Sequence, residues 1–191
     1  PMNSSAASDV YKRQLISCAP HSKVTMDTSD PIKEVPWSEC GYQVGDHPCN
    51  FTLKNQHGEI ANLYDFYGNI VVIDFSAMWC GPCAAAAREI QEVKESFEEQ
   101  GFSYLTVIID DASGLNPDEN DCKTWADTYG ITEPVLAGGR HMLDPAAHSG
   151  WAVSGWPTFY FINKDMIIRS SLRGFSSSSL NEMILDIIND D

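Results

Sequence analysis

The sequence of 191 residues contains no apolar run long enough to cross a bilayer as a helix, and it has few basic residues. Its 12 lysines and arginines stand against 27 acidic residues, which gives a net charge of −15. This balance argues against binding nucleic acid through a basic surface and against electrostatic attraction to anionic lipid headgroups. Internal repeats and a second domain are also lacking. An apolar content of 43% is ordinary for one globular domain with a tail.

Residues 1–14 and 19–36 are polar and show no periodicity. Residues 1–14, "PMNSSAASDVYKRQ", resemble a cloning or read-assembly scar, and we exclude them from fold reasoning. "LISCAP" at 15–20 resembles a bacterial lipobox, in which Cys18 would be lipidated and the native protein exported. The basic and apolar segments that precede a lipobox are missing, and a cysteine in a polar tail is the alternative. Residues 19–36 indicate a flexible tether, so the domain is expected over 37–191.

Hydrophobic periodicity predicts a hairpin followed by strands that alternate with helices. The expected elements are a hairpin in 50–60, strands over 70–77 and 102–109, helices over 82–100 and 119–129, a short strand in 134–138, strands in 155–163 and 166–172, and a helix over 180–188 capped by Ser176 or Ser177. This order predicts a mainly parallel sheet with helices on both faces and an antiparallel edge.

The stretch "SAMWCGPCAAAAREI" at 76–90 places Cys80 and Cys83 between a strand and a helix. Cysteines at positions i and i+3 of a first helical turn face the same way, so their sulfurs can bond. Unpaired N–H groups at the helix start favour a thiolate at Cys80, while Cys83 lies deeper. Cys80 is therefore expected to attack and Cys83 to resolve a thiol–disulfide exchange. A structural staple is less favoured because so short a loop constrains little chain entropy.

The other cysteines indicate an oxidising compartment. Cys40 and Cys49 bracket the turn-rich stretch "GYQVGDHP" and are expected to close a structural disulfide loop. Cys122 is left alone on its helix. A metal site is the rival for Cys80 and Cys83, but no second C-x-x-C motif or paired histidine is present. His141, Met142 and His148 leave open a copper-binding or thiol-buffering lipoprotein without turnover.

"VVIDFSAMWCGPC" resembles the active-site strand and turn of thioredoxins, and "GWPTFYFIN" resembles their cis-proline loop. The segment "VGDHPCNFTLKNQHGEIANLYDFYGNIVV" is similar to the exported TlpA/ResA-like branch, and the resemblance extends from about Val44 to the C-terminus. It implies a thioredoxin fold, a central mixed sheet with helices on both faces and an added N-terminal hairpin. It also implies a protein-disulfide oxidoreductase on the periplasmic side, without a cofactor.

The resemblance carries roles to particular residues. Pro157 is expected to form a cis bond with Trp156 in a loop that faces the dithiol and offers backbone hydrogen bonds to a client. Trp79 would wall the exposed sulfur together with Trp156, although core packing is the alternative for each. The expected substrate-binding set is Trp79, Gly81, Pro82, Trp156, Pro157 and Thr158. Partners would be client proteins with cysteines or disulfides, such as apocytochromes before haem attachment, and a membrane electron donor.

Three further positions refine this interpretation. Asp74, six residues before Cys80, matches the buried acid of thioredoxins and is expected to take a proton from Cys83; an aspartate merely held by hydrogen bonds is the alternative. Ala84 stands where thioredoxins commonly have a basic residue, so the Cys80 thiolate loses a cationic neighbour. Ala77 stands where peroxiredoxins have the threonine of their P-x-x-x-T-x-x-C motif, which argues against peroxidase chemistry.

Overall fold

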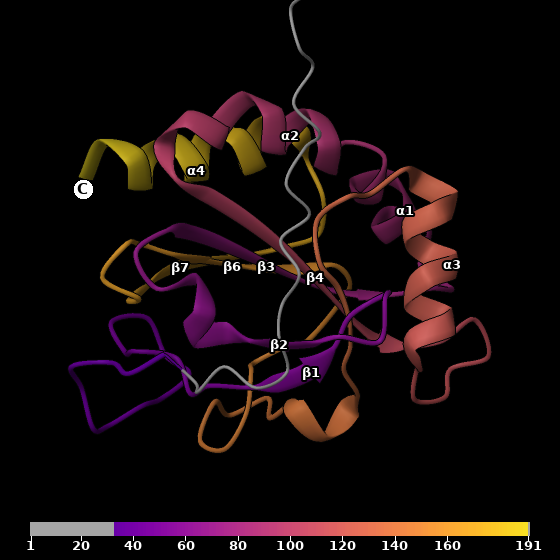
Figure 1. Cartoon of the computed structure of the whole chain (residues 1–191), viewed down its shortest axis with the longest axis horizontal. Coiled ribbons are helices and arrows are strands. Elements are labelled where there is room, and N and C mark those ends of the chain that lie inside the picture. Colours follow the sequence, from indigo (N-terminus) through magenta and orange to yellow (C-terminus); the bar gives the residue numbers. More distant parts are fainter. Residues whose placement is uncertain (1–32, 191) are drawn as a thin grey trace, which may run out of the picture.

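The computed structural model describes residues 33–190, so Cys18 and most of the expected tether lie outside the described residues. A five-stranded sheet crosses the domain with helices above it and a small hairpin below it (Figure 1). The elements in chain order are β1 (Thr52–Lys54), β2 (Ile60–Asn62), η1 (Leu63–Phe66), β3 (Ile70–Ala77), α1 (Gly81–Ala87), α2 (Ile90–Phe97), η2 (Glu98–Gln100), β4 (Phe102–Asp110), α3 (Glu119–Tyr129), β5 (Val135–Ala137), η3 (Arg140–Met142), β6 (Thr158–Ile162), β7 (Ile168–Arg173) and α4 (Ser177–Asp190).

The sheet has the strand order β5-β4-β3-β6-β7, with β3 at its centre. β3 runs parallel to β4 and antiparallel to β6, and β7 closes the antiparallel edge. All eight residues of β3 are buried, as an apolar strand covered on both faces must be. The mixed sheet and the added β1–β2 hairpin confirm the predicted fold class.

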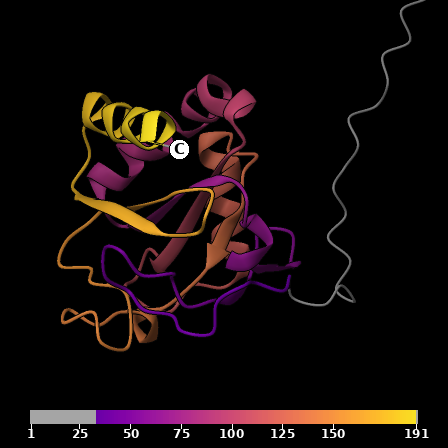
Figure 2. The same cartoon turned by 90° about the vertical axis from the view of Figure 1, so that its left-hand side faces the viewer.

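Alternate residues of β3 enter two separate cores. Ile70 and Val72 face a core formed with α1, α2, α3 and α4. Val71 and Ile73 face a second core, covered by the hairpin, η1, η3 and the long β5–β6 connection. Figure 2 shows these two layers on opposite sides of the sheet. Among the described residues, α1, α2, α3 and α4 therefore share one face, and the 3-10 helices η1 and η3 cover the other together with the hairpin and the β5–β6 connection.

The segment before β1 is fixed to the edge of the sheet at β7. The N–H of Gly45 donates to the carbonyl of Ile168, and the N–H of Ile168 donates to the carbonyl of Asp46. Trp37 stacks on His47, whose Nδ1 lies 2.9 Å from the carbonyl oxygen of Met166. These contacts cover the β7 edge, which would otherwise expose unpaired backbone groups.

One helix differs from the expectations of the sequence, and another begins where they placed its cap. The helix expected over 82–100 is split by a turn at Arg88 and Glu89, where the N–H of Glu89 donates to the carbonyl of Ala86. No glycine or proline marks that break, so the continuous periodicity concealed it. The last helix begins at Ser177, and the hydroxyl of Ser176 accepts the N–H of Ser179 at 3.5 Å, which confirms the cap expected at Ser176 or Ser177.

Candidate active site

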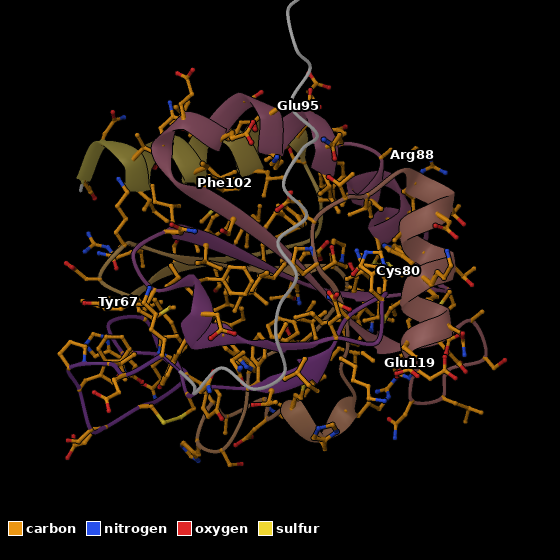
Figure 3. All side chains as sticks on the ribbon, viewed as in Figure 1. Tyr67, Cys80, Arg88, Glu95, Phe102 and Glu119 are labelled. Carbon is orange, nitrogen blue, oxygen red and sulfur yellow. A yellow bond between two sulfur atoms is a disulfide. The ribbon has the colours of Figure 1, made fainter. Side chains whose placement is uncertain are left out.

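Cys80 lies where β3 ends and α1 begins (Figure 3), and Cys83 lies in the first turn of α1. Their sulfurs are bonded, and their Cα atoms are 5.2 Å apart. Cys80 is the N-cap of α1, and its sulfur accepts the N–H of Cys83 at 3.2 Å. Pro82 fits the first turn because the N–H that it lacks would have no helical partner there. Cys80 is 5% exposed to solvent, whereas Cys83 is fully buried, so an incoming thiol reaches Cys80 first.

Two tryptophans stand beside the exposed end of the disulfide. Trp79 is 50% exposed, and its ring meets that of Trp156 edge to face with centroids 6.4 Å apart. Gly81 and Pro82 are exposed next to them. Apolar surface that remains in water around a reactive sulfur is suited to contact a polypeptide client.

The Trp156–Pro157 peptide bond is cis, and Pro157 is buried. Its carbonyl accepts the N–H of Gly174 at 2.7 Å, which joins this loop to the end of β7. Thr158 is also buried, and its hydroxyl donates to the carbonyl of Gly155 at 2.8 Å. The side chain of Thr158 therefore shapes the loop from inside and does not face solvent.

Asp74 is buried in β3 on the side of the sheet that faces the α-helices. Its carboxyl accepts hydrogen bonds from the hydroxyl of Ser76 at 2.8 Å and from that of Tyr104 at 3.2 Å. Burial raises the pKa of Asp74 to about 7, against the smaller opposing effect of these two bonds. A carboxyl poised near neutrality can take up and return a proton at physiological pH.

A second buried carboxylate, Asp110, was missed by sequence reasoning. It ends β4 opposite Ala77 and is 1% exposed. The indole Nε1–H of Trp79 donates to Asp110 Oδ2 at 3.2 Å, and the guanidinium of Arg140 binds both carboxylate oxygens. The only sequence signal was an acid that ends a long apolar strand, with Gly138 and Gly139 preceding the arginine.

The remaining sequence candidates take no part in the contacts described above. Cys40 and Cys49 are joined, with their Cα atoms 4.8 Å apart, and Cys122 is a buried free thiol. His141 and His148 are exposed, and Met142 is half-buried. Within residues 33–190, no group of three or more histidine, cysteine or acidic side chains is arranged to hold a metal ion.

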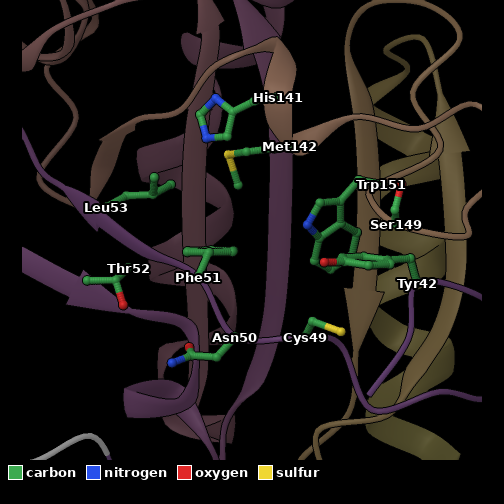
Figure 4. A pocket seen from close by; sticks show the side chains of 10 residues that line it. All are labelled: Tyr42, Cys49, Asn50, Phe51, Thr52, Leu53, His141, Met142, Ser149 and Trp151. Atoms are coloured by element: carbon green, nitrogen blue, oxygen red, sulfur yellow. The ribbon is translucent and has the colours of Figure 1, made fainter. Parts of the chain in front are cut away.

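A pocket of 280 Å³ lies under the β5–β6 connection (Figure 4). Its lining includes Tyr42, Cys49, His141, Met142 and Trp151. None of the side chains around Cys80 lines it, so the pocket and the dithiol are separate features. Among the described residues, no helix is long and apolar enough to cross a membrane.

Comparison with known families places the chain. The AhpC/TSA family matches residues 44–171, about two thirds of the sequence. The chain belongs to the AhpC/TSA family. This AhpC/TSA chain is 27% identical over 149 residues to the thioredoxin-like protein YneN of Bacillus subtilis, covering 78% of this chain and 82% of that protein.

Two further proteins that resemble the chain have names that refer to thiol–disulfide exchange. The thiol-disulfide oxidoreductase ResA of Oceanobacillus iheyensis is 28% identical over 137 residues, covering 70% of this chain and 66% of that protein. A solved structure from Chlorobium tepidum, whose proposed identity is the thiol:disulfide interchange protein DsbE, superposes with a TM-score of 0.62 at 23% identity. It covers 77% of this chain and 99% of that chain, which establishes the thioredoxin fold for this AhpC/TSA protein.

Proposed function

We propose that the protein exchanges disulfides with cysteines of client proteins through Cys80 and Cys83. The observation that carries this proposal is the bonded pair at the start of α1, with Cys80 as the sulfur nearer to solvent beside two tryptophans. In the reduced enzyme, the Cys80 thiolate attacks a client disulfide, forms a mixed disulfide and releases one client thiolate. Cys83 then attacks the Cys80 sulfur, which restores the Cys80–Cys83 disulfide and releases the second client thiolate.

Asp74 serves the second step as the acceptor of the Cys83 proton. Its burial on the helix-covered side of β3 and its pKa of about 7 suit a base that works near neutrality. The proton must leave Cys83 before or during its attack, since the thiolate is the nucleophile. Hydrogen bonds from Ser76 and Tyr104 orient the carboxyl and partly offset the rise in its pKa that burial causes.

The favoured direction is reduction of clients. Cys80 and Cys83 enclose Gly81-Pro82, the thioredoxin dipeptide. Thioredoxin has a potential of about −270 mV, whereas the oxidant DsbA lies at about −120 mV. A glutathione titration of the Cys80–Cys83 pair therefore tests direction, and a value near the thioredoxin end is expected. A value near that of DsbA would reverse the assignment to an oxidant.

The cellular setting follows from the TlpA/ResA-like segment and the cysteines. Export to the periplasmic side agrees with the Cys40–Cys49 disulfide, and lipidation of Cys18 would tether the domain to the membrane. Clients would be cysteine-containing proteins such as apocytochromes before haem attachment. A membrane donor would return the electrons that each client takes.

The direct test is reduction of insulin driven by dithiothreitol, with peroxide consumption measured in parallel. Insulin reduction above the rate with dithiothreitol alone is expected. Hydrogen peroxide consumption is expected to be absent, because Ala77 lacks the hydroxyl of the peroxiredoxin motif. Peroxide turnover without insulin reduction would replace the proposal. Copper bound tightly by a protein inactive towards insulin would instead favour the copper-binding alternative around His141 and Met142.

A further inference from the structure

The side chain of Trp79, the residue before Cys80, is only half-buried. The ring is 50% exposed, and its aromatic contact with Trp156 is edge to face at 6.4 Å. Its Nε1–H donates to Oδ2 of Asp110 at 3.2 Å. A half-exposed side chain populates several rotamers unless a directional contact selects one. The orientation of the Trp79 ring therefore depends on where the carboxylate of Asp110 is held.

Arg140 holds that carboxylate. Its Nε donates to Asp110 Oδ1 at 2.9 Å, and its Nη2 donates to Oδ2. Asp110 is 1% exposed, whereas the Arg140 side chain is 62% exposed, so the guanidinium closes the carboxylate off from water. A buried carboxylate left without its cation is costly, and the two-pronged contact also fixes its plane. The carbonyl of Asp110 accepts the N–H of Met78, which ties the same residue to the chain just before Trp79.

Two glycines bring Arg140 to this position. A side chain on Gly138 would place its Cβ 2.7 Å from Val107 Cγ1 and 3.0 Å from the carbonyl oxygen of Ile108. The N–H of Gly138 bonds that same carbonyl at 2.9 Å. A Cβ on Gly139 would lie 2.8 Å from Nδ1 of His141. Gly138 therefore lets the chain pass close to the backbone at the end of β4, and Gly139 spares a shift of the exposed His141 ring, so that Arg140 emerges above Asp110.

We propose that Arg140 is a positioning residue for client binding, which acts through Asp110 to fix the Trp79 indole as a wall beside Cys80. This inference rests on the proposed function. The hydrogen bonds of the Arg140 guanidinium go to Asp110 and not to either sulfur, so its effect falls on the surface that receives a protein client. Without Arg140, the carboxylate of Asp110 turns toward water, and Trp79 loses the acceptor that selects its rotamer. Small disulfides do not need the wall and are attacked as before.

The test uses Arg140→Gln in the full chain, with Arg140→Lys as the conservative variant and Arg169→Gln as a control. Arg169 is an exposed arginine that binds Asp190 of the last helix, away from Cys80. The first readout is solvent exchange of the Trp79 indole N–H by NMR, with its signal identified through Trp79→Phe. The second readout is kcat and KM for insulin, compared with the rate for oxidised glutathione.

In Arg140→Gln we expect indole exchange to accelerate about tenfold, since a hydrogen bond to a charged group is lost. KM for insulin should rise by roughly three- to tenfold with kcat within about twofold, and the glutathione disulfide rate should not change. In Arg140→Lys, the indole exchange rate and the KM for insulin should lie between those of the parent and those of Arg140→Gln. Lysine keeps the positive charge but cannot make the two-pronged contact with the carboxylate. Arg169→Gln should match the parent.

Unchanged indole exchange in Arg140→Gln would overturn the proposal, and so would faster exchange with an unchanged KM for insulin. If that variant is too unstable to assay, the double variant Asp110→Asn, Arg140→Gln removes the unpaired charge, and the same two readouts decide. A parent protein that does not reduce insulin contradicts the proposed function instead. The indole exchange still tests the Arg140–Asp110–Trp79 connection in that case, because it requires no turnover.

Discussion

Residues 33–190 contain two disulfides that join cysteines at similar Cα separations, 4.8 Å for Cys40–Cys49 and 5.2 Å for Cys80–Cys83, in very different surroundings. Cys40 is exposed, and the loop that it closes is held by backbone bonds to the β7 edge. Cys80 and Cys83 begin a helix beside two tryptophans, on the sheet face that also buries Asp74. The environment, rather than the bond, therefore separates a disulfide that closes a loop from one equipped to exchange.

The two disulfides also differ in the length of chain that each closes into a loop. In the chain-entropy account, a span of nine residues stabilises the fold by roughly 2.5 kcal/mol, and a span of three by roughly 1.5 kcal/mol. The shorter bond restricts the unfolded chain less, so reducing it during each cycle costs the fold less. A pair that must open and close repeatedly suits the shorter span.

The largest expected effect comes from breaking the exchanging pair. Cys80→Ser should abolish insulin reduction, with a loss of about a thousandfold or more, because no attacking thiolate remains. Cys83→Ser should accumulate mixed disulfides with clients, because the resolving thiol is gone. Non-reducing electrophoresis of trapped complexes checks both. The double variant Cys40→Ser, Cys49→Ser is the control and should keep turnover within about twofold. Trapping by Cys80→Ser would reverse the two roles.

The next effect concerns Asp74, the acid buried on the sheet face that also holds Cys80 and Cys83. The pKa of Asp74 is raised to about 7 by burial, so the folded protein holds a proton that the unfolded chain releases near pH 4. The stability from this group is complete below pH 4 and is lost as the pH rises to 7. The loss is on the order of 4 kcal/mol at about 1.4 kcal/mol for each pKa unit. Asp74→Asn should remove this slope from the pH dependence of urea unfolding.

The same variant tests the role of Asp74 in exchange. Resolution of the mixed disulfide should slow by roughly tenfold or more in Asp74→Asn, and the pH–rate profile should change near neutrality. Asp165→Asn, at an exposed aspartate in the β6–β7 turn, should match the parent in both assays. Equal resolution rates for Asp74→Asn and the parent from pH 6 to 8 would make Asp74 part of the core only.

The sequence allowed the place of Cys80 and Cys83 in the fold to be predicted because its signals are local. An apolar run gives β3, the C-x-x-C spacing gives the start of α1, and Gly130 marks the end of α3. Each signal depends on residues within one or two turns of one another. Pro157 was found by resemblance, and its place beside the site depends on the pairing of β6 with β3.

What the sequence could not predict depends on contacts between distant residues. Asp110 and Arg140 are 30 residues apart, and the two glycines before this arginine do not indicate which distant acid it will meet. Ser76 and Tyr104 around Asp74 become partners only when β3 and β4 align. The break at Arg88 was not predicted because the residues around it favour a continuous helix, so the local sequence was misleading there.

A smaller effect is expected from breaking the loop-closing pair. Cys40→Ser, Cys49→Ser should lower the free energy of unfolding by roughly 2–3 kcal/mol, measured by urea denaturation at a fixed pH. The loss should exceed that of Cys80→Ser, Cys83→Ser, whose closed loop is shorter. Hydrogen exchange should quicken at the N–H groups of Gly45 and Ile168, because the loop is held there against β7. A larger loss for the Cys80, Cys83 variant would contradict the assignment of Cys40–Cys49 as the structural bond.

The smallest effect is expected at the third type of cysteine, the buried free thiol of Cys122. Burial, with the added charge of Asp121, raises the pKa of Cys122 to about 12, so almost no thiolate exists at pH 8. In the oxidised protein carrying Cys18→Ser, iodoacetamide should therefore leave Cys122 unlabelled until guanidinium unfolds the chain. Cys122→Ala should keep insulin reduction within about twofold and cost on the order of 1 kcal/mol for the small cavity. Peptide mapping that finds Cys122 bonded to Cys40 or Cys49 would contradict both assignments, of Cys40–Cys49 as the structural disulfide and of Cys122 as a free thiol.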